Sequence, residues 1–246
     1  MLGKSPAWQD AGGACSSYLI EEGDRRLLLD CGNGAFGKLR EACAFAAVEA
    51  VVISHLHADH FFDLVPYAYA LAYSPAATGA RPVLHAPPGG REAFRRITGT
   101  WDDEQLIERA FDVREYDASS ELELGPLQVR FHEVPHFIRT HAVQVRGAGA
   151  SFTYGADCGP NDAIVAFAQG TDLLMLEAAI QQPERDDVRG HLTPAEAGAH
   201  ARRAGARRLV LSHISADVDA GWAHAEAAEA FGGPVEIARE GSIYEV

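Results

Sequence analysis

Three histidines and one aspartate fall within six consecutive residues, in the order His55, His57, Asp59 and His60. They follow a short apolar run, 48–53, which predicts a buried strand. Side chains alternate along an extended chain, so His55 and His57 project to the same side, and the next turn carries Asp59 and His60 elsewhere. One segment can therefore supply ligands to two neighbouring metal ions. Imidazole nitrogens and carboxylate oxygens suit zinc, manganese or iron.

A simpler interpretation is that these are ordinary histidines near a helix start, with Asp59 as a favourable charge at the N-terminus of that helix. Isolated histidines are common, but this order of residue types after a buried strand favours metal ligands. The order also resembles the signature H-x-H-x-D-H of the metallo-β-lactamase superfamily.

Three later segments match the rest of that superfamily's pattern, in the right order and over nearly the whole chain. His136 ends a predicted strand, Asp157 follows another strand in a Gly-Asp-like turn, and His213 ends a late apolar strand. The resemblance implies two divalent ions, zinc first and manganese as the alternative. It assigns His55, His57 and His136 to one ion, Asp59, His60 and His213 to the other, and Asp157 to a bridge between them.

The remaining histidines fit this scheme less well. Strand alternation puts His132 on the same face as His136, which makes it a weak rival ligand. The other histidines lie in ordinary strand or helix contexts that indicate structural roles. Cys158 directly follows Asp157, and a small buried side chain is a better interpretation of it than a ligand.

The composition favours one soluble domain over residues 1–246, which is enough chain for a large core. A formal net charge of −14 repels polyanions at long range, which argues against a long nucleic acid but not against a small phosphoester. The four cysteines form no C-x-x-C pair, and no apolar run approaches eighteen residues. We therefore expect a cytoplasmic protein with a small-molecule substrate and no membrane partner, compatible with a homodimer.

Strands alternate with amphipathic helices along the chain, and this pattern predicts layered α/β packing. One helix is expected from Asp59 through Leu71. A second begins at Thr193, with Pro194 at its first position and Glu196 three residues after the cap, and runs to Ala204. The resemblance implies the specific form of the fold, a four-layer αβ/βα sandwich of two packed mixed sheets with helices on both outer faces. The metals would lie at one edge of it.

Two ions sharing a site can lower the pKa of a bridging water, polarise the bond under attack and stabilise the leaving oxygen, so hydrolysis by a metal-bound hydroxide is expected. Segments 173–179 and 191–197 resemble the paired boxes of the transfer-RNA 3′-processing (RNase Z-like) branch. The resemblance places His191 near the leaving group, oriented by Glu177, and both are counted as catalytic together with Asp59. The alternative is that His191 is only a loop residue and Glu177 its structural partner.

The chain departs from that branch in two ways. Leu176 and Ala179 replace the histidine and threonine of the first box, and only 21 positions separate His136 from Asp157, too few for the branch's RNA-gripping arm. We therefore expect a phosphodiesterase for a small phosphoester or nucleotide-like substrate. A lactonase, thioesterase or β-lactamase is the alternative, and a transfer-RNA 3′ endonuclease is less favoured. A di-iron redox protein is disfavoured because His57 is not glutamate and no flavin-binding domain follows.

Overall fold

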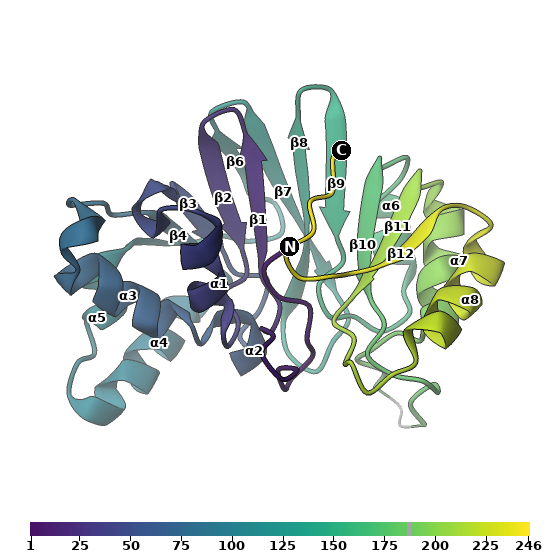
Figure 1. The fold of residues 1–246 in the computed structure, drawn as a ribbon, viewed down its shortest axis with the longest axis horizontal. Coiled ribbons are helices and arrows are strands. Elements are labelled where there is room, and N and C mark those ends of the chain that lie inside the picture. The colour runs from purple at the N-terminus through teal and green to yellow at the C-terminus, as the bar shows by residue number, and fades with distance from the viewer. Residues whose placement is uncertain (186–187) are drawn as a thin grey trace.

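Two mixed β-sheets form the centre of the computed structural model, which describes residues 1–185 and 188–246 (Figure 1). The first sheet has the order β1 (Tyr18–Glu22), β2 (Arg25–Leu29), β3 (Ala50–Val52), β4 (Val83–Ala86) and β5 (Asp112–Glu115). The second has the order β12 (Val235–Ile237), β11 (Arg208–Ser212), β10 (Leu173–Glu177), β9 (Ala150–Tyr154), β8 (Thr140–Gly147), β7 (Leu127–Val134) and β6 (Glu121–Leu124).

Helices cover the outer face of each sheet (Figure 1). The first sheet carries α1 (Ala35–Ala42), α2 (Ala58–Phe61), α3 (Leu64–Tyr73), α4 (Gly90–Thr98) and α5 (Leu106–Ala110). The second carries α6 (Asp162–Phe167), α7 (Pro194–Ala204) and α8 (Ala220–Phe231). Within the part of the chain that the structure describes, no helix is both long enough and apolar enough to cross a membrane.

Alternation along the strands divides the apolar side chains among three cores. In β3, Ala50 and Val52 face the second sheet, whereas Val51 packs under the helices of the first. In β10, Met175 faces the first sheet and Leu174 packs under α6, α7 and α8. Because both faces of these central strands are buried, they are continuously apolar up to Glu177, the last residue of β10. The three cores separate four layers, and the predicted four-layer αβ/βα sandwich is confirmed.

Parallel strands bring the candidate site residues to one edge of the sandwich. β2 and β3 are parallel, and so are β9, β10 and β11. The carboxyl ends of parallel strands meet at the same edge of their sheet, and segments that follow such strands lie side by side there. The loop after β3 carries His55, the loop after β9 carries Asp157, and the residue after β11 is His213.

The helix predicted from Asp59 through Leu71 is wrong as a single element, because the structure divides it into α2 and α3. The backbone of Cys31 forms hydrogen bonds with two backbone groups that a continuous helix would use within itself. Its N–H donates to His60 O (2.7 Å), and its carbonyl accepts from Asp63 N (3.0 Å). Two elements were not expected from the sequence, the short helix α5 and the edge strand β6.

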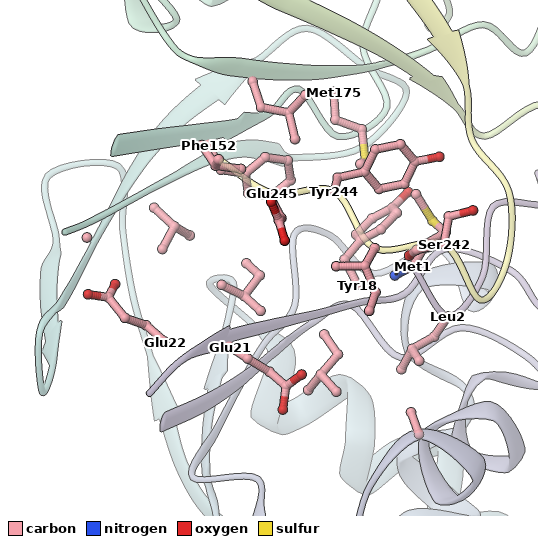
Figure 2. A pocket seen from close by; sticks show the side chains of 18 of the residues that line it. Met1, Leu2, Tyr18, Glu21, Glu22, Phe152, Met175, Ser242, Tyr244 and Glu245 are labelled. Atoms are coloured by element: carbon pink, nitrogen blue, oxygen red, sulfur yellow. Dashed lines mark hydrogen bonds between the residues drawn. The ribbon is translucent and has the colours of Figure 1, made fainter. Parts of the chain in front are cut away.

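A cavity of about 850 Å³ lies between the sheets, and Tyr18, Phe152 and Met175 are among the residues that line it (Figure 2). The chain end contributes too, with Tyr244 close to these side chains. None of the seven candidate ligands is among the described residues that line this cavity. It is therefore separate from the candidate site.

Candidate metal centre

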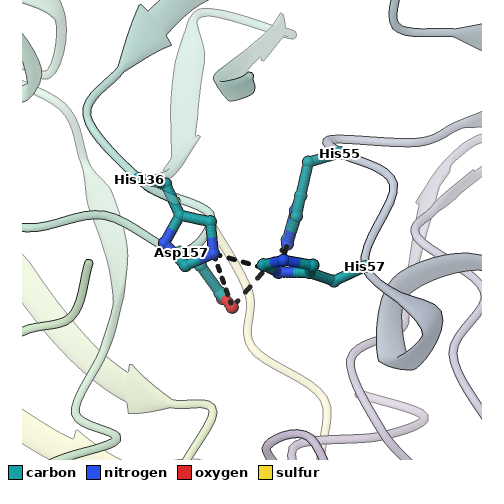
Figure 3. Close-up of side chains that lie close together, drawn as sticks. All are labelled: His55, His57, His136 and Asp157. Atoms are coloured by element: carbon teal, nitrogen blue, oxygen red, sulfur yellow. Dashed lines mark hydrogen bonds and ion pairs between the residues drawn. The ribbon is translucent and has the colours of Figure 1, made fainter. Parts of the chain in front are cut away.

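Four of the predicted ligands form a first group, His55, His57, His136 and Asp157, whose ligand atoms all lie within 4.8 Å of one another. His57 Nδ1 lies 3.2 Å from His55 Nε2 and 3.0 Å from His136 Nε2. Asp157 Oδ2 lies 3.8 Å from His55 Nε2 and 4.0 Å from His136 Nε2 (Figure 3). Tetrahedral ligands bonded at 2.0–2.2 Å are separated by about 3.4 Å, so this spacing suits a single ion.

The second group contains Asp59, His60, His213 and again Asp157. Asp157 Oδ2 lies 3.3 Å from His213 Nε2 and 3.4 Å from His60 Nε2. Asp59 Oδ2 lies 3.4 Å from His60 Nε2 and 3.8 Å from His213 Nε2. The structure thus brings all seven predicted ligands together, in the predicted division, with Asp157 common to both groups. Ligation of metal by these atoms remains a prediction.

Four of the five histidines have their other ring nitrogen held by a neighbour. His60 Nδ1 donates to Asp30 Oδ2 (2.8 Å), and His136 Nδ1 donates to the carbonyl of Gly190 (2.8 Å). The Nδ1 atoms of His55 and His213 each lie 3.1 Å from a serine hydroxyl, of Ser54 and Ser16 respectively. Such outer partners fix ring orientation and leave Nε2 for a metal.

Burial lowers the pKa of His55 well below its ordinary value and the pKa of His136 and His213 to about 4. These rings are therefore neutral near pH 7 and keep a lone pair for a cation. For His60, burial lowers the pKa, but the charges of Asp157 and Asp30 outweigh it and raise the pKa well above its ordinary value. Metal binding at His60 must displace a proton.

Two buried polar atoms support the fit of a cation to these groups. Among the described residues, His60 Nε2 and Asp157 Oδ1 are buried without any hydrogen-bond partner. Buried polar groups in native proteins nearly always have a partner, so an imidazole nitrogen and a carboxylate oxygen of the same group that both lack a hydrogen bond indicate a missing one. The donor set of five imidazoles and two carboxylates suits zinc, with manganese as the alternative.

Glu177 and His191 form a hydrogen-bonded pair at the border of the two groups. His191 Nδ1 donates to the Glu177 carboxylate, at 2.9 Å from Oε1 and 3.0 Å from Oε2. The His191 ring is stacked with that of His213, with centroids 6.0 Å apart, and lies 5.1 Å from that of His136. The predicted capping box of Thr193 and Glu196 is present at the start of α7 and holds the backbone just after His191.

The remaining histidines lie outside both groups, as far as the described residues show. His132 stacks on Phe167 at a centroid distance of 5.3 Å, and its prediction as a rival ligand is wrong. β7 ends at Val134, so strand alternation no longer relates His132 to His136. His200 and His224 bond to backbone groups, and His85 and His141 are buried in their strands.

Cys158 belongs to neither group within the described residues. Its backbone N–H donates to Glu177 Oε1 at 2.8 Å, and its side chain is fully buried. Burial raises the pKa of the Cys158 thiol well above its ordinary value, which disfavours the thiolate that metal ligation requires. The geometry is in accord with its prediction as a small buried side chain.

Asp30 is a residue of the site that was missed from the sequence. It has no exposed surface, and it takes a left-handed backbone conformation at φ 57° just after β2. Its carboxylate accepts from Ser54 N (2.7 Å), Ser54 Oγ (2.8 Å), His60 Nδ1 (2.8 Å) and Tyr154 Oη (3.2 Å). An acidic residue directly after an apolar run, 27–29, was the available signal.

Asp30→Asn should weaken metal binding at the second group by about 10–100-fold, because the amide lacks the charge that orients His60. Asparagine tolerates the left-handed conformation, so the backbone should be preserved. Competition with a metal indicator dye would measure the affinity. Asp172→Asn is a matched control, since Asp172 accepts from both N and Oγ of Ser151 at a distance from the histidines. A metal affinity in Asp30→Asn that equals that of Asp172→Asn and of the wild type would contradict the role of Asp30.

Comparison with known proteins extends over most of the chain. The family model described as the beta-lactamase superfamily domain matches residues 25–214. The sequence is 29% identical over 234 residues to the probable metallo-hydrolase YhfI of Bacillus subtilis. This match covers 94% of this chain and 93% of that protein. The sequence is also 29% identical over 283 residues to a ribonuclease Z of Halorubrum lacusprofundi, covering 93% of this chain and 90% of that protein.

Solved structures show the same arrangement. The crystal structure of Bacillus subtilis YhfI matches with a TM-score of 0.87 at 26% identity, over 99% of this chain and 97% of that one. A diphosphatase of the PhnP family matches with a TM-score of 0.74 over 100% of this chain and 96% of that one. Because the identity to the diphosphatase is only 19%, this similarity shows a shared fold and nothing more.

Proposed function

This chain belongs to the beta-lactamase superfamily of metallo-hydrolases. We propose that it is a phosphodiesterase that uses two protein-bound divalent ions to cleave a small phosphoester. The observation that carries the proposal is the Glu177–His191 pair beside the two groups of candidate ligands. An alkoxide is a poor leaving group, so a phosphodiester needs a proton donor at the leaving oxygen in addition to metal ions. The similarity to a ribonuclease Z over 93% of the chain supports phosphoester chemistry.

The seven candidate ligands would hold zinc ions, or manganese ions as the alternative, with Asp157 between them. Bound there, the ions would polarise the phosphoryl group and lower the pKa of a water. The rest of the chemistry falls to side chains. The oxygen of a water bonds to phosphorus and its proton passes to solvent, the phosphorus–oxygen bond to the alcohol breaks, and a proton from His191 passes to the departing oxygen. His191 then regains a proton from solvent.

His191 is suited to this role by its protonation state. Burial lowers its pKa, but the hydrogen bond to Glu177 and the charge of that carboxylate outweigh burial and raise the pKa to about 9. The imidazole therefore carries its second proton near neutral pH, as a general acid must. Glu177 bonds to Nδ1, which leaves Nε2 as the nitrogen that can reach a substrate.

The substrate is proposed to be small. The segment between His136 and Asp157 contains only β8 and β9, which are joined by a short turn and form a plain hairpin. The chain has a formal net charge of −14, and this charge opposes a long polyanion.

A transfer-RNA precursor should therefore bind weakly and should not be cleaved at its 3′ end. Filter binding and gel analysis between about 50 and 200 mM salt would measure both, since phosphate contacts make affinity strongly salt-dependent. The Halorubrum lacusprofundi ribonuclease Z is a suitable positive control. Tight, salt-sensitive binding followed by 3′ cleavage would overturn the small-substrate proposal.

A substrate panel tests the function itself. It comprises bis-aryl phosphodiesters, cyclic nucleotides, lactones and a β-lactam, each assayed with zinc and with manganese added to metal-free protein. We expect the highest kcat/KM for a phosphodiester and no hydrolysis by the metal-free protein. A higher kcat/KM for a lactone or β-lactam would contradict the phosphodiesterase and favour the alternative hydrolase class.

A further inference from the structure

Phe137 presents an aromatic ring at the border of the candidate site. It follows His136 directly, and the residue is 53% exposed. The centroid of its ring lies 5.0 Å from that of His136 and 5.7 Å from that of His191. An aromatic ring with this much exposed surface beside a proton donor is placed to contact whatever the donor acts on.

The ring of Phe137 packs against Gly190, which holds it in place. A Cβ atom at position 190 would lie 2.3 Å from Cε2 and 2.5 Å from Cζ of Phe137, so any side chain there would displace the ring. Gly190 does not adopt a positive φ, so its backbone conformation does not require glycine. The carbonyl of Gly190 also accepts from His136 Nδ1, and His191 is the next residue. One peptide segment thus fixes Phe137 relative to both histidines.

We infer that Phe137 is a specificity residue that stacks on a planar, apolar group of the leaving alcohol. The inference rests on the proposed function and narrows its substrate class to aryl, benzyl or nucleoside phosphodiesters. The oxygen that receives the proton of His191 must lie within hydrogen-bond reach of that imidazole. The first atoms bonded to this oxygen then lie beside the neighbouring ring of Phe137. The other ester group, which stays on phosphorus, has no such constraint.

Two diesters of equal size separate stacking from general apolar contact. Methyl benzyl phosphate offers a planar ring, and methyl cyclohexylmethyl phosphate offers a puckered ring on the same linker. The metal-loaded wild type should release benzyl alcohol and should prefer the benzyl ester. Phe137→Leu should lower kcat/KM for the benzyl ester by about 5–150-fold, the range for loss of one stacking partner. The cyclohexylmethyl ester should change by less than about twofold.

Matched variants accompany this measurement. Phe137→Trp keeps a flat ring and should keep the preference. Trp101→Leu removes an exposed aromatic ring from the turn after α4 and should change neither substrate. Inhibition by methyl benzylphosphonate, which cannot be cleaved at its phosphorus–carbon bond, gives a binding readout, and it should weaken in Phe137→Leu. Metal content of each variant shows whether the site is intact.

Three results would overturn the inference while the proposed function stands. The first is an equal loss of kcat/KM for both diesters in Phe137→Leu. The second is a wild-type kcat/KM that is the same for the benzyl and the cyclohexylmethyl ester. The third is release of methanol instead of benzyl alcohol. Loss of metal from both Phe137→Leu and Phe137→Trp would make Phe137 a structural residue and overturn it as well. If the wild type cleaves neither diester but cleaves a lactone or β-lactam, the proposed function itself fails, and the inference fails with it.

Discussion

Replacing Asp157 with alanine should abolish hydrolysis and remove at least one metal ion from each chain. Asp157 Oδ2 lies within 4.0 Å of Nε2 of four histidines, and the residue is only 2% exposed. Burial raises its pKa, but in the acid range, where His213 is protonated as well as His60, the positive charges of these rings outweigh burial and hold the pKa well below its usual range. The carboxylate is therefore ionised and is common to both candidate sites.

The expected loss of kcat/KM for Asp157→Ala is about 10³-fold or more, because several kcal/mol of charge stabilisation depend on the ions. Elemental analysis of protein purified without chelator would measure metal content, and circular dichroism would check the fold. Asp157→Asn, which keeps the shape and loses the charge, should act in the same direction. Asp162→Ala is the control, since that side chain is 87% exposed and pairs only with Arg203 among the described residues. Normal metal content and full activity in Asp157→Ala would eliminate the bridging role.

His191→Ala should keep both metal ions and lower turnover by about 10²–10⁴-fold, the range for loss of a general acid. The loss should shrink for a diester with a good leaving group such as nitrophenolate, which needs little protonation. His224→Ala is a suitable control, because His224 contacts the carbonyl of Val235 instead of the site. A loss of metal from His191→Ala would show that His191 is a ligand or a structural residue. Equal losses for good and poor leaving groups would mean that it binds the phosphoryl oxygens.

The pH profile gives a second readout of the same role. The protonated form of His191 is the active one, and Glu177 raises its pKa above the ordinary value, so wild-type kcat should fall on the alkaline side, as the pH rises through that pKa. His191→Ala should lack this alkaline fall. Glu177→Gln removes the charge that raises the pKa of His191 and should move the fall to lower pH. An unchanged profile in Glu177→Gln would contradict the positioning role of Glu177.

The candidate ligands could be predicted because each lies next to a short pattern that is legible in the sequence. Four of them share one six-residue segment, and His136, Asp157 and His213 each follow a strand. The topology then brings the ends of those strands to one edge, which the fold family also implies. The pairing of His191 with Glu177 was predicted from the resemblance of segments 173–179 and 191–197 to the paired boxes, and the structure has this hydrogen bond, with a strong helix cap just beyond His191. The catalytic role of His191 stays a prediction.

The features that could not be predicted depend on contacts between distant segments. Asp30 meets His60 across 30 positions, and no local pattern links the two. The break between α2 and α3 comes from hydrogen bonds to the backbone of Cys31. The contact of Phe137 with Gly190 likewise joins a strand end to a later loop. His132 was misplaced because alternation was extended past the last residue of β7.

The division of ligands between the two halves of the chain has a consequence for folding. His55 and His57 come from the half that builds the first sheet, and His136 comes from the other, 79 positions after His57. His60 and His213 are divided in the same way. An ion held by both halves acts as a crosslink between the two sheets, available only to the folded chain. At a free concentration 100 times its dissociation constant, such an ion adds about 2.7 kcal/mol to the free energy of unfolding. The metal ions proposed to activate water would thus also link the two β-sheets of the sandwich.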